Sequence, residues 1–538
     1  MKAFAAPVDD ILFSLEHVAG ASRLADWDGE LAGEVIRHFA AFAEGEIAPL
    51  DEAGDRQGAR LVNGRVIMPD GFKTLYRAYT GQGWTGLTAP ADLGGQGLPA
   101  PVLAATSEIF SGANQSLQMV TALVPGAIST ILHFGTDEQK ARLVPPLATG
   151  QWLSTMCLTE PASGSDLSTV RTRAVEEGGA WRISGEKIFI SGGDQDMSEG
   201  ILHLVLARTG AVEDGTRGLS LFVCLDKKPD GSRNAVSVAR IEDKMGLHAS
   251  PTCQMVFDGA QAEIIGKPGE GLKAMFTMMN HARIDVSLQG VAHSARAADI
   301  ARSYARQRLQ GRDAATGEPV TIDRHPDIAA KLDEQDMLAM GLRALCHTAL
   351  VALEEGADPD LVDFLTPVCK YACSEAGIRA ANLGIQILGG YGYLREYRVE
   401  QTFRDARISA IYEGANGIHA LTLATRMLRN RNGAAAAAFE AFVAVEAESG
   451  PLSAPLAQGL DIWRQGRHMM TETSGPAENA EAFMEMTAQV ALLAMWNRIA
   501  KAEERHPDPS RLHRLAALAR RLCPARIRYW FDLHQVAA

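Results

Sequence analysis

The sequence lacks the features that would place it in a membrane or an export pathway. No apolar run approaches the roughly 20 residues that cross a bilayer. The first residues, MKAFAAPVDDILF, have no basic segment before an apolar one, and Asp9 and Asp10 are unlike an Arg-rich transit peptide. We therefore expect a soluble chain in the cytoplasm.

A surplus of basic residues is also missing. Lys and Arg number 52 against 65 Asp and Glu, which gives a net charge of −13. Proteins that bind nucleic acid through its phosphates usually show the opposite balance. General nucleic-acid binding is therefore disfavoured, while local basic patches remain compatible with this total.

Cysteine is scarce and mostly dispersed. There are seven cysteines, an odd number, and Cys369 and Cys373 lie four residues apart in an apolar helical stretch. A metal pair is one interpretation, but no neighbouring His or Cys completes it, and free cysteine is commonly a core residue. Packing is favoured, and a reducing compartment fits best.

The chain does contain blocks of different periodicity. Its 538 residues are too many for one ordinary domain. Helical spacing dominates before about 150, where Thr136 and Gln139 match a capping box. From about 156 to 265, segments such as GILHLVLARTG and GLSLFVCLD indicate a β domain. Helical patterns return from about 270 to 430, and an alanine-rich run after 432 predicts a further helix.

One segment imitates a nucleotide-binding motif. GQGWTG, residues 81–86, matches the letters GxGxxG, which bind a dinucleotide only between a strand and a helix. Here the segment follows the helical GFKTLYRAYT and runs into LTAP, where Pro90 disfavours a helix. A turn is predicted.

Six segments occur in one order over residues 80–430: GWTGLTAPADLGGQGLP, FGTDEQKARLVPPLATGQW, CLTEPASGSDLSTVRTRA, ISGEKIFISGG, QILGGYGYLREYRVEQTFRDARI and IYEGANGI. Their order and spacing resemble the acyl-CoA dehydrogenase family of flavoproteins. The opening APVDDILF, the NHARID helix and the tail after 432 resemble most its longer bacterial branch, which includes 3-methylmercaptopropionyl-CoA dehydrogenases.

The resemblance implies an α+β fold in four parts. These are an N-terminal α-helical domain (1–155), a central β-barrel-like domain (156–268), a C-terminal four-helix-bundle domain (269–431) and a helical C-terminal extension (432–538). The independent periodicity of the sequence gives the same order of helical and β segments.

Glu413, in IYEGANGI, is the residue on which a function depends most. It precedes the helical run NGIHALTLATRML, so it is expected near the first turn, where an acid also stabilises the helix dipole. On the residues alone, that dipole role is preferred. The resemblance reverses the preference: it implies that Glu413 takes the α-proton of an acyl-CoA while the β-hydrogen passes as hydride to flavin N5. It also implies that the Glu413 N–H and a flavin hydroxyl bind the thioester oxygen.

Several residues are implied to lie at the substrate. Some family branches carry the base immediately before the arginine of the NHAR segment, but that position is Ala282, which cannot take a proton. Arg283 matches the family arginine near the base, where a cation stabilises ionised Glu413, with an ordinary ion pair as the alternative. The remaining substrate contacts implied by the resemblance are Asn280, where the family commonly has Asp, together with Ser165 and Gly414.

FAD is the implied cofactor. The family holds it through backbone and hydroxyl groups that match Leu158, Thr159, Gly164, Ser165 and Ser191. Phe189 matches an aromatic residue packed on the isoalloxazine, and burial in the strand core is an equal alternative. Ala415 and Gly417 replace side chains that commonly touch the flavin, so polar contact there is expected to be weaker.

A second set of flavin contacts is implied to cross a subunit interface. Arg308 matches an arginine for the pyrophosphate, and Gln386 and Gly390 match a loop for the adenosine half. The alternatives are a solvated charge for Arg308 and a helix C-cap for Gly390. The interface reading predicts a homodimer or homotetramer.

The predicted activity is FAD-dependent dehydrogenation of an acyl-CoA to a trans-2-enoyl-CoA, with electrons passed to an electron-transfer flavoprotein. An oxygen-using acyl-CoA oxidase and a non-catalytic, DNA-associated flavoprotein are the alternatives. Acyl chain length, branching and the use of a sulfur-containing acyl group are left open by the sequence.

Overall fold

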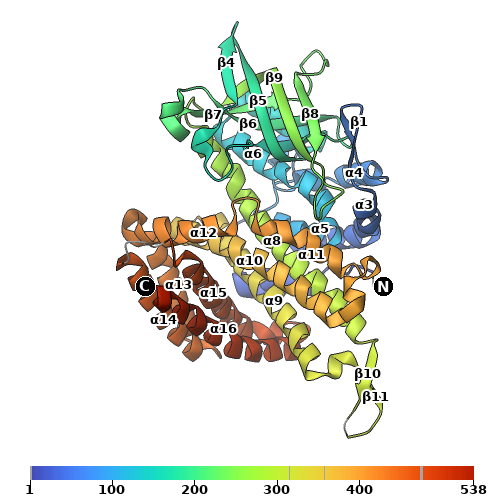
Figure 1. Ribbon diagram of the computed structural model, residues 1–538, viewed down its shortest axis with the longest axis vertical. Coiled ribbons are helices and arrows are strands. Elements are labelled where there is room, and N and C mark those ends of the chain that lie inside the picture. The colour runs from blue at the N-terminus through green and yellow to red at the C-terminus, as the bar shows by residue number, and fades with distance from the viewer. Residues whose placement is uncertain (1–2, 314, 357, 473–476, 538) are drawn as a thin grey trace. The chain divides into compact units, whose positions relative to one another are not determined.

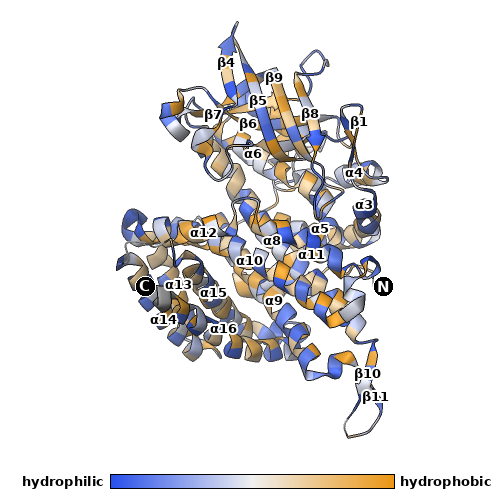
Figure 2. Ribbon diagram, viewed as in Figure 1, coloured by the Kyte–Doolittle hydropathy of each residue, from blue (hydrophilic) through white to orange (hydrophobic). Residues whose placement is uncertain are grey.

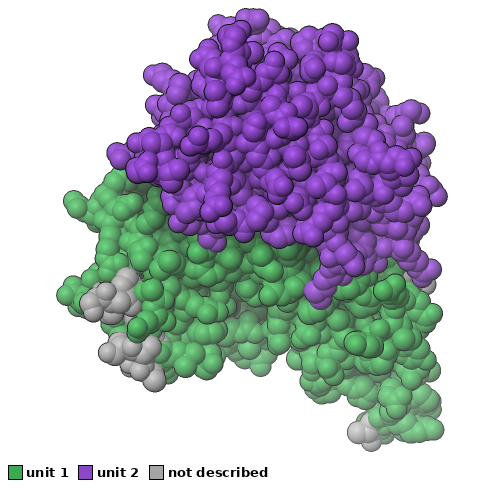
Figure 3. Space-filling model, turned by 45° about the horizontal axis from the view of Figure 1, so that its top comes forward, with its two compact units in different colours: residues 1–44, 100–112, 283–538 green, residues 45–99, 113–282 purple. Residues whose placement is uncertain are grey.

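The computed structural model describes residues 3–313, 315–356, 358–472 and 477–537, apart from the side chains of Asn280 and of residues 534–537. The chain divides into two compact units, coloured separately in Figure 3. Unit 1 comprises residues 1–44, 100–112 and 283–538, and unit 2 comprises residues 45–99 and 113–282. Helices α5 (Ala100–Thr121) and α8 (Gly271–Ala305) contribute to both units. The domain boundaries at 155, 268 and 431 stay predictions.

Unit 2 is built on a closed sheet (Figure 1). Its strands are β3 (Trp152–Cys157), β4 (Arg173–Glu177), β5 (Ala180–Ser191), β6 (Gly200–Arg208), β7 (Leu219–Leu225), β8 (Val236–Ile241) and β9 (Thr252–Ile265). β6 pairs with β7, β7 with β9, β9 with β5 and β5 with β4, and β4 returns to β6 through Arg173 and Arg208. β3 is added beside β6 and β8 beside β9. The predicted barrel-like β domain is confirmed.

Hydrophobic patterning explains these strands. β9 alternates buried and less buried residues over most of its length, as a strand with one face on a core must. β6 is buried at every position, which matches its nearly continuous apolar sequence. Figure 2 shows the resulting mixture of hydrophobic and hydrophilic residues along the strands of the barrel.

The rest of unit 2 is mainly helical, with α3 (Asp51–Gln57), α4 (Phe72–Gly81), α6 (Leu123–Phe134) and α7 (Asp137–Ala148). The capping box of α7 is confirmed: Thr136 Oγ1 accepts from Gln139 N at 3.2 Å, and Gln139 Oε1 accepts from Thr136 N at 3.0 Å. GQGWTG forms the end of α4 and a 3-10 turn, as predicted. The hairpin of β1 (Arg60–Val62) and β2 (Arg65–Ile67) was not predicted, since such short strands carry little periodicity.

Unit 1 is helical apart from the hairpin of β10 (Leu309–Arg312) and β11 (Pro319–Thr321). Its helices, besides parts of α5 and α8, are α1 (Val8–Phe13), α2 (Gly29–Phe42), α9 (Pro326–Glu355), α10 (Pro359–Leu388), α11 (Val399–Arg407), α12 (Asn416–Thr422), α13 (Ala434–Ala447), α14 (Ser453–Glu472), α15 (Ala480–Ala502) and α16 (Pro509–Ala537).

The apolar stretch of α9 is long enough to cross a membrane, but 89% of it is buried within the structure.

The C-terminal extension is part of the core of unit 1. One continuous hydrophobic cluster joins residues of α9 and α10 to residues of α13, α14, α15 and α16 (Figure 1). Trp463 and Trp496 of the extension are fully buried in it. The C-terminal extension therefore packs on its own chain.

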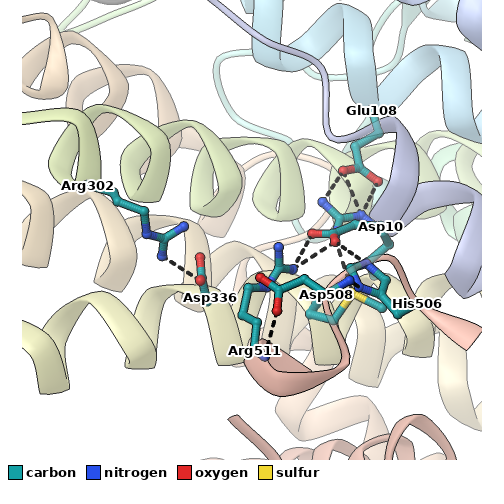
Figure 4. Close-up of polar contacts among 9 residues, drawn as sticks. Asp10, Glu108, Arg302, Asp336, His506, Asp508 and Arg511 are labelled. Carbon is teal, nitrogen blue, oxygen red and sulfur yellow. Dashed lines mark hydrogen bonds and ion pairs between the residues drawn. The ribbon is translucent and has the colours of Figure 1, made fainter. Parts of the chain in front are cut away.

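Asp10 of α1 ties the N-terminal segment to this extension (Figure 4). Its carboxylate accepts hydrogen bonds from His506 Nε2 at 2.9 Å and from Arg511 Nη2 at 2.7 and 2.8 Å, and Arg343 Nη1 lies 3.5 Å away. Arg343 also forms a buried ion pair with Glu108, with Nη2 2.7 Å from Oε1. Buried charges are tolerated when they are paired in this way.

Candidate functional site

Glu413 lies in a strained turn between α11 and α12. Its backbone φ is +54°, a left-handed conformation that costs a residue with a Cβ about 1–2 kcal/mol, and Gly414 follows at φ +98°. α12 begins at Asn416 with Ala415 as its N-cap, so the expectation that Glu413 lies in the first helical turn is corrected. A helix-dipole role explains neither this backbone nor its cost, and such outliers concentrate at functional sites.

The carboxylate of Glu413 is held in a desolvated environment. Its Oε2 is buried and has no hydrogen-bond partner among the described residues. Burial raises the pKa of Glu413 to about 7, and the charges of Arg283 and Lys370 oppose that rise, while Asp285 adds to it. A carboxylate with this pKa can both lose and take a proton near neutral pH.

The backbone of the turn is fixed by three side chains. Glu413 O accepts from His419 Nε2 at 3.1 Å and more weakly from Arg283 Nε at 3.5 Å. Lys370 Nζ donates to Gly414 O at 2.7 Å. A Cβ at Gly414 would lie 2.9 Å from the His419 ring, so glycine is required there by both space and φ.

Tyr412, the residue before Glu413, belongs to a second group of hydrogen-bonded side chains. The Tyr412 hydroxyl donates to Gln289 Oε1, and Gln289 Nε2 donates to Asp285 Oδ2 at 2.8 Å. Ser107 Oγ donates to the same carboxylate, at Oδ1. Because Asp285 also acts on the charge of Glu413, this chain of hydrogen bonds links the Glu413 turn to α5 and α8 within unit 1.

Sequence reasoning did not find Lys370, Asp285, Gln289 or His419. Lys370 stands in the apolar helical segment VCKYACSEAG, where a lysine is usually a solvated residue. Its contact with the turn joins segments far apart in the chain, so no local pattern shows it. A charged residue in an otherwise buried helical stretch is the one signal available.

The predicted flavin residues of unit 2 form one cluster beside β5. The loop after β3 is joined to that strand, because Ile188 N donates to Thr159 O at 2.9 Å and Lys187 Nζ donates to Leu158 O at 2.8 Å. Lys187 is fully buried and pairs with Glu160 at 2.9 Å. The loop that carries Gly164 and Ser165 is thus anchored to the strand that carries Phe189 and Ser191.

Phe189 is not a core residue. Its side chain is 60% exposed and its backbone φ is +58°, at a register shift where β5 pairs with β9. The strand-core alternative is therefore wrong. An exposed aromatic residue in a strained conformation fits a surface built for a flat ligand. Gly164 fits as well, since a Cβ there would meet no atom within 4 Å and the backbone stays open to a ligand.

Replacing Phe189 tests whether its ring binds the cofactor and does not stabilise the fold. We expect Phe189→Ala to change the free energy of unfolding by less than about 1 kcal/mol, because the side chain is mostly exposed. We expect it to weaken FAD binding at least about tenfold through loss of ring stacking. Urea unfolding and fluorescence titration of apoprotein with FAD measure the two effects. Phe222→Ala, at a fully buried ring, is the control and should cost about 3–5 kcal/mol. Unchanged FAD affinity in Phe189→Ala would contradict the stacking role.

The predicted interface residues lie together in unit 1. Arg308 Cζ lies 5.8 Å from the centre of the Tyr391 ring, next to Gly390, and Gln386 is on the last turn of α10. Arg308, Gln386 and Gly390 are all exposed. The C-cap of α10 is Gly389, so Gly390 is not needed as a cap.

The structure says little about Asn280, a candidate substrate residue, and about Gly417, where a side chain that commonly touches the flavin is missing. The side chain of Asn280 lies outside the described residues, so its predicted contact with substrate stays a prediction. Gly417 is exposed at the start of α12, and a Cβ there would meet no atom within 4 Å. Among the described side chains, no group of three His, Cys, Asp or Glu residues is placed to hold a metal ion.

The strained, desolvated carboxylate of Glu413 and the exposed ring of Phe189 suit an oxidoreductase of the flavoprotein class. Family models match the chain in order: acyl-CoA dehydrogenase N-terminal domain at residues 32–151, middle domain at 155–260 and C-terminal domain at 269–428. The chain belongs to the acyl-CoA dehydrogenase family, whose members bind FAD and act on acyl-CoA.

Individual relatives agree with this assignment. The chain is 41% identical over 473 residues to the 3-methylmercaptopropionyl-CoA dehydrogenase of Ruegeria pomeroyi, over 84% of this chain and 80% of the relative. It resembles the solved butyryl-CoA dehydrogenase of Megasphaera elsdenii with a TM-score of 0.66 and 26% identity, over 74% of this chain and 98% of the other. An acyl-CoA dehydrogenase of Bacillus anthracis, solved in complex with FAD, shares the fold with a TM-score of 0.75 and 22% identity, over 95% and 89% of the two chains.

Proposed function

We propose that this protein is an FAD-dependent acyl-CoA dehydrogenase in which Glu413 removes the α-proton of the acyl group. The observation that supports it most is the carboxylate itself. Its Oε2 is buried, it lies near two cations, and it is carried by a turn held out of its preferred conformation. Strain and desolvation of this kind have no structural benefit and suit a group that must meet a reacting carbon.

The reaction requires a base whose pKa lies near the working pH. An α-proton beside a thioester is only weakly acidic, and general bases work best with a pKa near the working pH. Burial raises the pKa of Glu413 to about 7, whereas Arg283 and Lys370 keep part of the population ionised. In the proposal the Glu413 N–H and the Arg283 charge stabilise the oxygen on which negative charge develops.

The residues present fit FAD. Leu158, Thr159, Gly164, Ser165 and Ser191 would offer backbone and hydroxyl groups, and Phe189 an exposed ring. Arg308 with Gln386 and Gly390 would hold the phosphate and adenosine half of FAD bound to a second copy of the chain, which makes the protein a homodimer or homotetramer. When bound, the flavin supplies the hydride acceptor that no protein side chain provides.

The partners follow from the same chemistry. The reduced cofactor must pass its electrons on, and an electron-transfer flavoprotein is the proposed acceptor. Because the identity to the Ruegeria pomeroyi relative is 41%, a sulfur-containing short acyl-CoA is the first substrate to try. The cytoplasm remains the proposed location.

An acyl-CoA panel tests the proposal. We expect one or more acyl-CoAs, mixed anaerobically with the FAD-loaded protein, to bleach the flavin absorbance and yield a trans-2-enoyl-CoA. The panel should run from short linear to long and branched chains and include 3-methylmercaptopropionyl-CoA. Absence of bleaching by every member would contradict the proposal. Rapid peroxide formation during turnover in air would show that the protein is an oxygen-using acyl-CoA oxidase and not a dehydrogenase.

A further inference from the structure

Lys370 of α10 is fully buried, and both of its hydrogen bonds go to the turn that carries Glu413. Nζ donates to Gly414 O at 2.7 Å and to Asn416 Oδ1 at 2.8 Å. Both acceptors are neutral oxygens. Burying an ammonium group is costly, and neutral acceptors do not neutralise its charge. The positive charge of Lys370, and not only its hydrogen bonds, is therefore expected to act on this turn.

The contact of Lys370 with Asn416 is fixed from α10. Asn416 Nδ2 donates to Glu375 Oε1 at 2.7 Å and to Ser374 Oγ at 3.0 Å, which leaves Oδ1 to face Lys370. Gly414 and Asn416 flank Ala415, the N-cap of α12. Lys370 thus holds the turn on both sides of the helix start, directly after the left-handed residues.

The charged groups around the turn come from several segments, mainly α8 and α10. Arg283 and Lys370 favour ionised Glu413, and Asp285 disfavours it. Burial lowers the pKa of Lys370 to about 7, while the Glu413 and Glu375 carboxylates act against this fall. The other charged or titratable groups that act at this turn are Tyr412, His419, and Arg426 through its effect on Arg283. Burial lowers the pKa of His419 to about 3, so His419 is neutral at pH 7.

We infer that Lys370 is a positioning residue for proton abstraction, which holds the Glu413 turn and supplies one of the two positive charges that keep its carboxylate ionised. The inference rests on the proposed role of Glu413 as the base. If Lys370 acts in this way, the pH range of the reaction depends on a lysine that lies outside the sequence motifs of the family.

The pH profile of flavin reduction is the decisive measurement. In the wild type the rate should rise with pH through about 7, because only ionised Glu413 can take a proton. Loss of a cation raises the pKa of a carboxylate, so Lys370→Met should move this rise to higher pH by about one unit. The rate at pH 6 should then fall about tenfold more than the rate at pH 9. Lys370→Arg should restore the wild-type midpoint.

The assay is anaerobic stopped-flow reduction at saturating acyl-CoA, with FAD content and thermal unfolding recorded for each variant. Asn416→Ala keeps the cation and removes one contact, so it should slow reduction at every pH and leave the midpoint within about 0.3 units.

A midpoint that Lys370→Met leaves unmoved, with slower reduction at all pH values, would overturn the inference and make Lys370 a structural residue. Should Lys370→Met fail to fold, Lys370→Gln keeps a hydrogen-bond donor without the charge and must show the same shift. Failure of the proposed function is separate: it appears as continued flavin reduction in Glu413→Gln, whatever the Lys370 variants do.

Discussion

We expect Glu413→Gln to lower the rate of flavin reduction by acyl-CoA about 10³-fold, within the range that a general base contributes. The amide has the same shape and carries no basic oxygen, and glutamine faces the same left-handed strain at φ +54°. FAD content and acyl-CoA affinity should therefore stay close to wild type. Single-turnover reduction under anaerobic conditions, with ligand titration of the oxidised protein, measures both.

Glu413→Asp provides a matched comparison. It keeps the charge and draws the carboxylate back by one methylene, and a misplacement near 1 Å costs up to about 10²-fold. We expect its rate to lie between wild type and Glu413→Gln. Reduction of Glu413→Gln at near wild-type rate would show that another group removes the proton.

Glu108→Ala should lower the free energy of unfolding strongly. Arg343 is fully buried, and Glu108 Oε1 lies 2.7 Å from its Nη2. Removing Glu108 leaves the Arg343 guanidinium with the more distant Asp10 carboxylate, 3.5 Å from its Nη1, and breaking a buried pair in this way costs about 3–5 kcal/mol. Denaturant unfolding of the FAD-loaded protein, followed by far-UV circular dichroism, measures the loss.

Two control variants test whether the loss of stability comes from the buried pair of Glu108 and Arg343. Glu52→Ala breaks the exposed pair with Arg56 and should change stability by less than about 0.5 kcal/mol. The double variant Glu108→Leu with Arg343→Met replaces the buried pair by apolar groups and should recover most of the loss. If Glu108→Ala and Glu52→Ala cost the same, the pair does not stabilise the core.

The sequence predicted the features that depend on neighbouring residues, namely helices, strands, a helix cap and a turn. The strand and helix blocks, the capping box at Thr136 and the turn at GQGWTG follow from periodicity and from residues with strong conformational preferences. The IYEGANGI and NHAR segments pointed to Glu413 and Arg283, and the structure places Arg283 Nε 3.5 Å from Glu413 O. Their chemical roles remain proposals.

Other features could not be predicted because they depend on distant contacts. Neither Glu nor Phe prefers a left-handed backbone, so φ values of +54° at Glu413 and +58° at Phe189 result from surrounding structure. At this turn, His419 and Arg283 donate to Glu413 O and Lys370 donates to Gly414 O, and these three residues lie on three other helices. The exposure of Phe189 was likewise hidden, since an aromatic residue in a strand is usually buried.

The anchoring of Asp10 has a consequence for synthesis of the chain. Its partners His506 and Arg511 lie 496 and 501 residues downstream. At ribosomal rates of about 5–20 residues per second, the N-terminal segment waits tens of seconds for them. All residues of the barrel emerge well before that, by Ile265. Unit 2 can therefore fold during translation, whereas α1 reaches these contacts only after Arg511 has been made. A ribosome-bound chain shorter than about 500 residues should leave α1 open to proteolysis.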